Sequence, residues 1–179
     1  MIKKPNTNQL IANSIMNLML TKSIDDISIQ DIADNCGITR QTFYNHFKDK
    51  YDLVDWIYKT EAVDYISLIG KDCSWYDAVI NKLNIIQRNP SFYRKIYRQQ
   101  WFLDSFYKIT KQLYLDVIRK NHTDGINKDL EFMVEFYCYA CVKKTSTWVT
   151  NGLKESPEEL VKSFITCIPD EMKRELLID

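Results

Sequence analysis

A run of hydrogen-bonding side chains at positions 40–46 is the part of the chain best suited to specific chemistry. Arg40, Gln41 and Asn45 each present two hydrogen-bonding atoms in one plane. Such groups pair with the edges of guanine, in the case of Arg, and of adenine, in the case of Gln and Asn, in the major groove of DNA. The segment therefore predicts that this protein contacts the bases of double-stranded DNA.

Polar groups that suit the phosphate backbone surround these three side chains. The side chains that we expect to contact phosphates are those of Thr39, Thr42, Tyr44, His46 and Lys50. Tyr44 could instead be a core aromatic, but Phe43 and Phe47 already occupy the inner positions of this segment. Phosphate contacts would fix the register of the protein on DNA and leave base preference to the other side chains.

Two short helices joined by a tight turn would hold these side chains in place. Ser28 can cap the first helix and Thr39 the second, and Gly37 tolerates the left-handed backbone that a sharp turn needs. The inner apolar positions are Ile32, Ala33, Ile38, Phe43 and Phe47. This pattern predicts a helix-turn-helix, whose second helix enters the major groove while the first braces it. The alternative is a helical hairpin without a role in DNA binding.

The remaining chain predicts an all-α fold, because it holds only four Gly and four Pro and its apolar residues recur at helical spacing. Expected helices begin near Asn6 or Thr7, Ser74, Pro90 and Asn127, span 50–69 and 101–120, and end at Gly70, Gly152 or Pro169. Ser156 and Glu159 form a capping box. We expect an N-terminal three-helix DNA-binding domain over 1–50, packed on a helical dimerisation and regulatory domain over 51–179.

Charge and cysteine content narrow the class of protein. The 24 basic and 24 acidic residues cancel, which argues against a polycation but not against DNA binding, since Lys3, Lys4 and Lys22 make the first 24 residues locally positive. Five scattered cysteines do not resemble a disulfide framework. No signal peptide and no apolar run of membrane-spanning length is evident. We expect a cytoplasmic protein with reduced thiols.

A metal or redox site is a weaker interpretation of Cys138 and Cys141. The chain offers no second Cys pair and only two His residues as further ligands, so two buried small side chains in an apolar helix are the expected outcome. No Gly-rich phosphate loop or nucleophile elbow is present. We therefore expect no cofactor, no metal and no enzymatic activity, and the non-regulator alternatives are an enzyme or a helical protein-interaction module.

The order of residues in the segment 32–53 resembles the DNA-binding domain of the TetR family. The matching positions are Ile32-Ala33, Gly37-Ile38-Thr39, Thr42-Phe43-Tyr44, His46-Phe47, Lys50 and Leu53. The resemblance implies an all-helical homodimer that binds a near-palindromic operator. It places phosphate contacts at Ser28, Thr39, Tyr44, His46 and Lys50, and base-reading positions at Arg40, Gln41, Thr42 and Asn45. Gln41 stands where many members have Gly, which implies a different operator preference.

The C-terminal half is similar to regulators of dihydroxyacetone kinase operons. Trp148, Gly152 and the Ser156-Pro-Glu-Glu159 segment carry this similarity, together with residues 40–45. Some members of that group are activators that work with a protein co-activator. We expect a repressor released by a small molecule, with a co-activator-dependent activator as the alternative.

The resemblance also implies an effector pocket and a dimer interface in the C-terminal half. The candidate pocket residues are Trp101, Phe102, Phe106, Tyr107, Met133, Phe136 and Tyr137. The candidate interface residues are Phe132, Phe136, Val149, Leu160, Val161, Phe164 and Ile165. The alternative for both sets is ordinary core packing, since an apolar stripe at helical spacing commonly faces the core.

Overall fold

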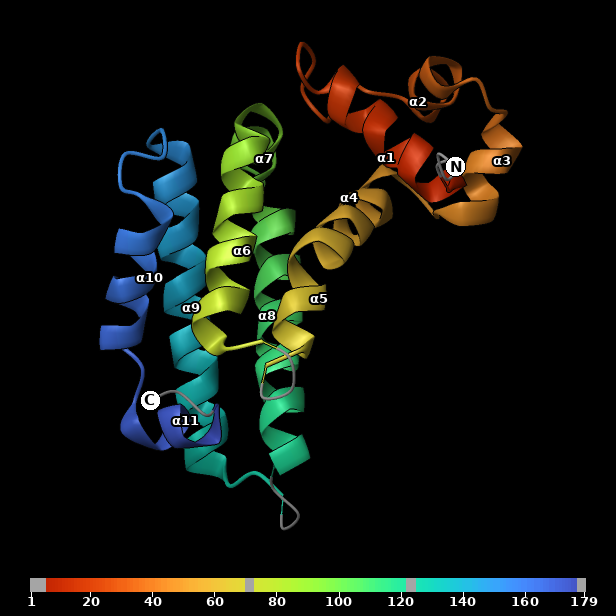
Figure 1. Cartoon of the computed structure of the whole chain (residues 1–179). Helices are drawn as coiled ribbons and strands as arrows, with labels where there is room; N and C mark the ends of the chain where they lie inside the picture. Colours follow the sequence, from red (N-terminus) through yellow and green to blue (C-terminus); the bar gives the residue numbers. More distant parts are fainter. Residues whose placement is uncertain (1–5, 70–72, 122–124, 177–179) are drawn as a thin grey trace, which may run out of the picture.

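The computed structural model describes residues 6–69, 73–121 and 125–176, and most of them are helical (Figure 1). The N-terminal helices are α1 (Thr7–Leu18), α2 (Ile29–Cys36) and α3 (Arg40–His46), followed by α4 (Lys50–Tyr58), the π-helix η1 (Lys59–Val63) and α5 (Asp64–Ser67). The C-terminal helices are α6 (Trp75–Arg88), α7 (Pro90–Ile96), α8 (Gln100–Asn121), α9 (Lys128–Thr150), α10 (Pro157–Thr166) and α11 (Asp170–Glu175). The all-α fold expected from the sequence is confirmed.

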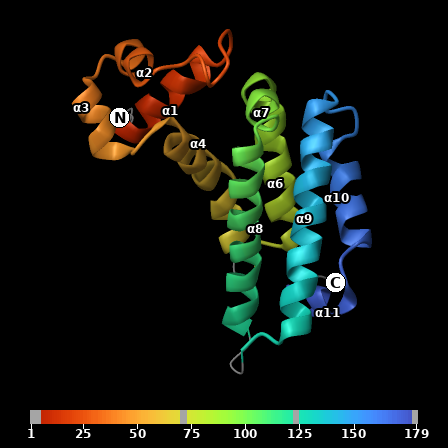
Figure 2. The same ribbon diagram turned by 180° about the vertical axis from the view of Figure 1, so that it is seen from behind.

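The helices form a small head and a larger body joined by α4. The head contains α1, α2 and α3 and lies to one side of the body (Figures 1 and 2). In the body α8 packs along α9, and α10 packs against α6. The head therefore presents α3 at the edge of the molecule that is farthest from the body (Figure 1).

Side-chain caps begin the helices where the sequence predicts them. Asn6 accepts a hydrogen bond from the Asn8 backbone, and Asp49, Ser74 and Asn127 cap α4, α6 and α9 in the same way. Ser156 and Glu159 form the expected capping box of α10. These local bonds satisfy backbone N–H groups that a helix start leaves without partners.

The expectation of one uninterrupted helix over 50–69 is corrected by the structure. The α-helix ends at Tyr58, five residues follow in a π-helical turn, and α5 resumes at Asp64. A π-helical turn holds more residues than an α-helical one and so changes the phase of the side chains that follow. Tyr58 before the turn and Ile66 after it are both buried. The expected end at Gly70 lies outside the described residues.

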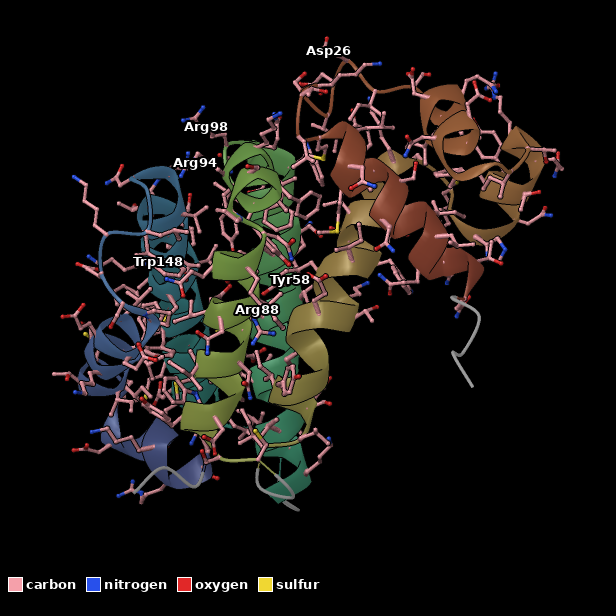
Figure 3. All side chains as sticks on the ribbon, turned by 45° about the horizontal axis from the view of Figure 1, so that its top comes forward. Asp26, Tyr58, Arg88, Arg94, Arg98 and Trp148 are labelled. Atoms are coloured by element: carbon pink, nitrogen blue, oxygen red, sulfur yellow. The ribbon has the colours of Figure 1, made fainter. Side chains whose placement is uncertain are left out.

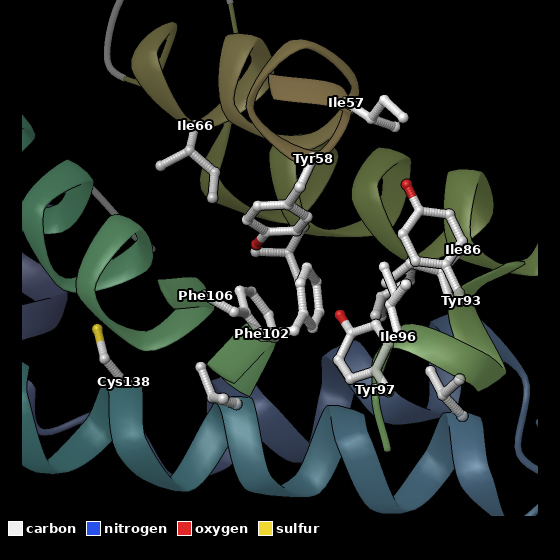
Figure 4. Close-up of a cluster of buried hydrophobic side chains, with 14 of the residues drawn as sticks. Ile57, Tyr58, Ile66, Ile86, Tyr93, Ile96, Tyr97, Phe102, Phe106 and Cys138 are labelled. Atoms are coloured by element: carbon white, nitrogen blue, oxygen red, sulfur yellow. The ribbon is translucent and has the colours of Figure 1, made fainter. Parts of the chain in front are cut away.

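A cluster of aromatic rings attaches α4 to the body (Figure 4). The Tyr58 ring meets Phe106 edge to face, with 4.7 Å between centroids, and Phe102 at 5.7 Å. Tyr97 contacts both phenylalanines, at 5.1 Å and 5.5 Å. Edge-to-face pairs of this kind add stabilisation beyond the apolar area that they bury. The direction of α4, and with it the position of the head, is therefore set by the body.

Hydrogen bonds at the end of α1 also attach the head to the body. The Lys95 ammonium on α7 donates hydrogen bonds to the carbonyl oxygens of Met19 and Lys22. On α4 the Asp55 carboxylate accepts a hydrogen bond of 2.7 Å from Ser105 of α8, and burial raises the pKa of Asp55.

Among the described residues, no helix is both long and apolar enough to cross a membrane.

Candidate DNA-binding site

The head fixes α3 through two aromatic anchors and leaves its polar face free. Phe43 and Phe47 are buried, and their ring centroids lie 5.9 Å apart. The remaining face of the helix is exposed, with Thr42 half-buried beside it, and it carries Arg40, Gln41, Tyr44, Asn45 and His46. The side chains expected to read bases thus share one solvent-exposed surface on one short helix.

Hydrogen bonds within α3 arrange this surface in pairs. Gln41 Nε2 donates to Asn45 Oδ1 at 3.2 Å. Arg40 Nη2 lies 3.5 Å from Tyr44 Oη, and the guanidinium carbon lies 6.0 Å from the centre of the tyrosine ring. Bonds at an exposed surface are readily exchanged for bonds to another partner, since water already competes for them. The pairs therefore pre-position four side chains without preventing a contact to DNA.

The turn between α2 and α3 has the geometry that the sequence predicts. Gly37 adopts φ of 70° and ψ of 34°, the left-handed conformation in which a side chain is disfavoured. Thr39 then caps α3, because its Oγ1 accepts a hydrogen bond of 3.1 Å from the Thr42 backbone. Thr39 and Thr42 also share a hydrogen bond of 2.9 Å between their hydroxyl groups. Both hydroxyls lie at the N-terminal end of the candidate reading surface.

Ser28 forms a second cap at the start of α2. Its hydroxyl accepts a bond from the Asp31 backbone and donates one of 2.6 Å to the Asp31 carboxylate. The carboxylate also accepts a bond from the Ser28 backbone N–H, and the Lys22 ammonium lies 3.2 Å from it. Hydrogen bonds from Ser28, supported by Lys22, lower the pKa of Asp31 to about 2. Ser28 is exposed beside this network, as its predicted phosphate contact requires.

Lys50 lies in a different environment from the one the sequence predicts for a phosphate contact. Its ammonium donates to the carbonyl oxygens of Ile24, at 2.7 Å, and Ile27, at 2.9 Å, and reaches that of Asp25 at 3.2 Å. An ammonium has three N–H donors, so these contacts account for all of them. The geometry gives Lys50 an internal role, which is to hold the loop between α1 and α2.

A buried polar joint between α1 and α2 was not identified from the sequence. The buried Ser14 hydroxyl donates to the Ile32 carbonyl at 2.8 Å and accepts a bond from the Asn35 side chain at 3.0 Å. Its signal in the sequence is a small polar residue three positions after Ile11 and next to Ile15, on the face of the helix that carries these apolar residues. This joint helps to set the angle of α2, which packs against α3.

The candidate effector residues are not brought together on one surface, and this expectation is corrected. Phe102 and Phe106 are buried in the aromatic cluster, and Tyr137 is buried beneath α10, where its hydroxyl bonds to the Phe164 carbonyl. Phe136, in contrast, is 69% exposed. The helical stripe contains both inward and outward positions, so these residues do not share one surface.

The candidate interface residues divide in the same way. Val149, Leu160, Val161 and Phe164 are buried within the protomer and are unavailable to a partner, which corrects that part of the expectation. The interface residues that remain accessible are Phe132, Phe136 and Ile165. Tyr139, which the sequence analysis did not assign to the interface, joins the first two on the outer face of α9 at 65% exposure.

The paired cysteines of α9 have the environment of structural thiols. Cys138 is buried, Cys141 is half-buried, and burial raises the pKa of the Cys141 thiol to about 11. A thiol with a raised pKa carries little of the thiolate that redox and metal chemistry need. Among residues 6–69, 73–121 and 125–176, no three His, Cys, Asp or Glu side chains gather in a way that could hold a metal ion.

Two family models match the chain. Residues 11–57 match the model of bacterial regulatory proteins of the tetR family, and residues 74–170 match a transcriptional regulator C-terminal region. The first of these models covers the whole helix-turn-helix. The C-terminal model covers more than half of the chain and extends from the start of α6 into α11.

Known proteins are similar over nearly the whole length. The HTH-type dhaKLM operon transcriptional activator DhaS of Lactococcus lactis is 26% identical in an alignment of 172 residues, which covers 93% of this chain and 91% of that protein. A solved structure named dihydroxyacetone kinase operon activator DhaS has a TM-score of 0.67 at 25% identity and covers 94% of this chain and 97% of its own. A TetR regulator from Streptococcus agalactiae has a TM-score of 0.64 at 19% identity, with coverage of 90% and 93%.

Proposed function

Because the chain belongs to the TetR family of transcriptional regulators, we propose that α3 reads operator DNA and that two copies of the chain bind one near-palindromic site. The observation that carries this proposal is the outer face of α3. Its polar side chains are exposed, while Phe43 and Phe47 fix the helix from within. In a twofold dimer, two such helices would enter successive major grooves about 34–36 Å apart.

Within this proposal the exposed α3 side chains divide by chemistry. Arg40, Gln41 and Asn45 supply base preference, with Thr42 beside them. Thr39, Tyr44 and His46, together with Ser28 at the start of α2, contact phosphates and set the register. A regulator that binds DNA acts in the compartment that contains the DNA. This is consistent with the cytoplasmic location expected from the cysteine content.

We propose that the two copies associate through the outer face of α9. Phe132, Phe136 and Tyr139 are 66%, 69% and 65% exposed, and their spacing of four and three residues places them on one side of the helix. Phe132 and Phe136 stack with ring centroids 6.3 Å apart, and Tyr139 contacts Tyr107 of α8 at 5.8 Å. Such a contiguous exposed aromatic surface is typical of a protein interface.

We propose activation as the direction of regulation. The repressor expectation came from the sequence alone, whereas the similar protein from Lactococcus lactis is named an operon activator and matches over both head and body. A reporter placed behind the selected operator tests this point. Activation predicts that deletion of the regulator lowers expression, and higher expression after deletion would instead identify a repressor.

The test of DNA reading begins with selection of duplexes from a random pool by the purified protein. We expect the recovered sites to be symmetric, with two half-sites about one helical turn apart. A variant with Arg40, Gln41 and Asn45 changed to Ala should keep the fold, because all three are exposed, and should recover no preferred sequence. Recovery of the same site by this variant would contradict the assignment of α3 as the reading helix.

A further inference from the structure

A groove on the side of the molecule joins the linker helix to the body. It has a volume of about 610 Å³ and lies between the end of α4, the π-helical turn and α8. Its apolar lining comes from Trp56, Ile109 and Leu113, all of which are half-buried. The volume falls in the range of sites that hold small organic molecules, and the lining suits a hydrocarbon chain or ring.

Two lysines give the same groove a positive charge. Lys59, in the π-helical turn, and Lys108, on α8, both line it and are both exposed. The polar residues between them are Thr60 and Gln112, which are uncharged, and Gln112 Nε2 already donates to Asp116 at 2.8 Å. Lys59 interacts electrostatically with the Asp55 carboxylate, which accepts a hydrogen bond from Ser105 of α8. A ligand for this groove must therefore combine apolar surface with an anionic group.

The groove is one side chain away from the reading helix. The Trp56 ring that lines it also packs edge to face against Phe47, with 5.6 Å between centroids. Phe47 is the C-cap residue that follows α3, and its ring contacts Phe43 beneath the reading surface. The π-helical turn supplies Lys59 and Thr60, and such turns occur often at functional sites. A molecule in contact with Trp56 would therefore change the packing of Trp56 on Phe47, which positions α3.

We propose that this groove binds an amphipathic organic anion, with its apolar part against Trp56, Ile109 and Leu113 and its carboxylate or phosphate between Lys59 and Lys108. Binding changes the packing of Trp56 on Phe47 and so changes the affinity of α3 for DNA. The proposal rests on the DNA-reading function for its second part only. The site is distinct from the body interior, where Phe102 and Phe106 are packed against Tyr58 and Tyr97.

Titration calorimetry of the DNA-free protein with sodium decanoate, below its micelle concentration, tests the site. Decanol, with the same chain and no charge, is the control ligand. The double variant K59Q/K108Q removes both ammonium groups, and K128Q/K162Q removes two exposed lysines of α9 and α10 with the same change in net charge. We expect K59Q/K108Q to bind decanoate about tenfold more weakly, since two exposed ionic contacts are lost, and K128Q/K162Q to bind like the wild type.

Two results would overturn the site: equal affinities of wild type and K59Q/K108Q for decanoate, or equal affinities of the wild type for decanoate and decanol. The second part is tested with the selected duplex, whose affinity decanoate should change by about fivefold or more in the wild type but not in K59Q/K108Q. An unchanged DNA affinity at saturating decanoate would overturn the coupling through Trp56. Because the first titration contains no DNA, its result does not depend on whether α3 reads an operator.

Discussion

At the scale of single residues, Arg40 is the side chain whose removal best separates base reading from phosphate binding. It lies over the Tyr44 ring on the exposed face of α3. Arg40→Ala should weaken binding to the selected site by about 1–3 kcal/mol and relax the preference at one base pair. Competition binding with site variants measures both effects.

The control for Arg40 is Arg98→Ala, which removes an exposed guanidinium that points outward beside Arg94 at the α7 end of the body (Figure 3). It should change neither the affinity for the selected site nor the base preference. If Arg40→Ala weakened specific and nonspecific duplexes to the same extent, Arg40 would be a phosphate contact.

Lys82 is a second residue whose environment has a measurable consequence. It is only 7% exposed, with its ammonium 4.4 Å from the centre of the Phe106 ring, and burial lowers its pKa from 10.5 to about 8. Below pH 8 the ammonium is charged in both folded and unfolded chains, so the folded state carries the full cost of burial. Between pH 8 and 10.5 the unfolded chain binds more protons, and this cost disappears as pH rises.

Lys82→Met should therefore raise the free energy of unfolding at pH 7, by up to about 3 kcal/mol for a pKa lowered by this amount. The gain should shrink as pH rises from 8 to 10. Urea unfolding of both proteins at each pH measures it as a difference, in which the opposing ionisation of the buried cysteines and tyrosines largely cancels. An advantage of the variant that stays constant across this range would contradict a lowered pKa of Lys82.

At the scale of elements, the loop between α1 and α2 depends on a lysine of α4. The three carbonyl contacts of the Lys50 ammonium tie α4 to residues 24–27. Lys50→Met should lower the free energy of unfolding by about 1.5–3 kcal/mol, since hydrogen bonds to a charged donor are lost. The salt dependence of DNA affinity should keep its slope, because this ammonium is occupied internally. Urea unfolding and binding at several salt concentrations measure the two quantities.

Lys48→Met is the matched control, because Lys48 is an exposed lysine in the same segment. It should leave the free energy of unfolding unchanged. A salt slope that falls by about one in Lys50→Met, with unchanged stability, would restore the phosphate contact that the TetR resemblance implies.

At the scale of the whole molecule, the proposed function depends on a second copy of the chain. One reading helix recognises only one half-site, and the outer face of α9 is the surface proposed to bring two copies together. Phe136→Glu places a charge at the centre of this surface, where it would be buried without a partner in the dimer. We expect monomers in analytical ultracentrifugation and a large loss of affinity for the symmetric site.

Leu20→Glu is the matched control for the dimer, because Leu20 is 62% exposed in the head, away from α9. It should sediment like the wild type. If Phe136→Glu remained dimeric, α9 would not be the interface, and the exposed aromatic residues would need another partner.

The local features of this protein follow from short stretches of its sequence. Caps such as Ser28 and Thr39, and the left-handed turn at Gly37, depend on residues within four positions of one another, so their types and spacing were sufficient to predict them. The anchors Phe43 and Phe47 followed from helical periodicity in the same way. The TetR resemblance rests on this segment.

The positions of side chains that contact distant parts of the chain depend on how the helices pack against one another. Lys50 contacts carbonyls more than twenty residues away, Ser14 joins α1 to α2, and α9 buries Tyr137 while it exposes Phe136. The π-helical turn, which helps to form the groove, likewise depends on how α4 meets the body. An apolar stripe predicts that one face of a helix will be covered. The packing of all the helices together decides which residues cover it.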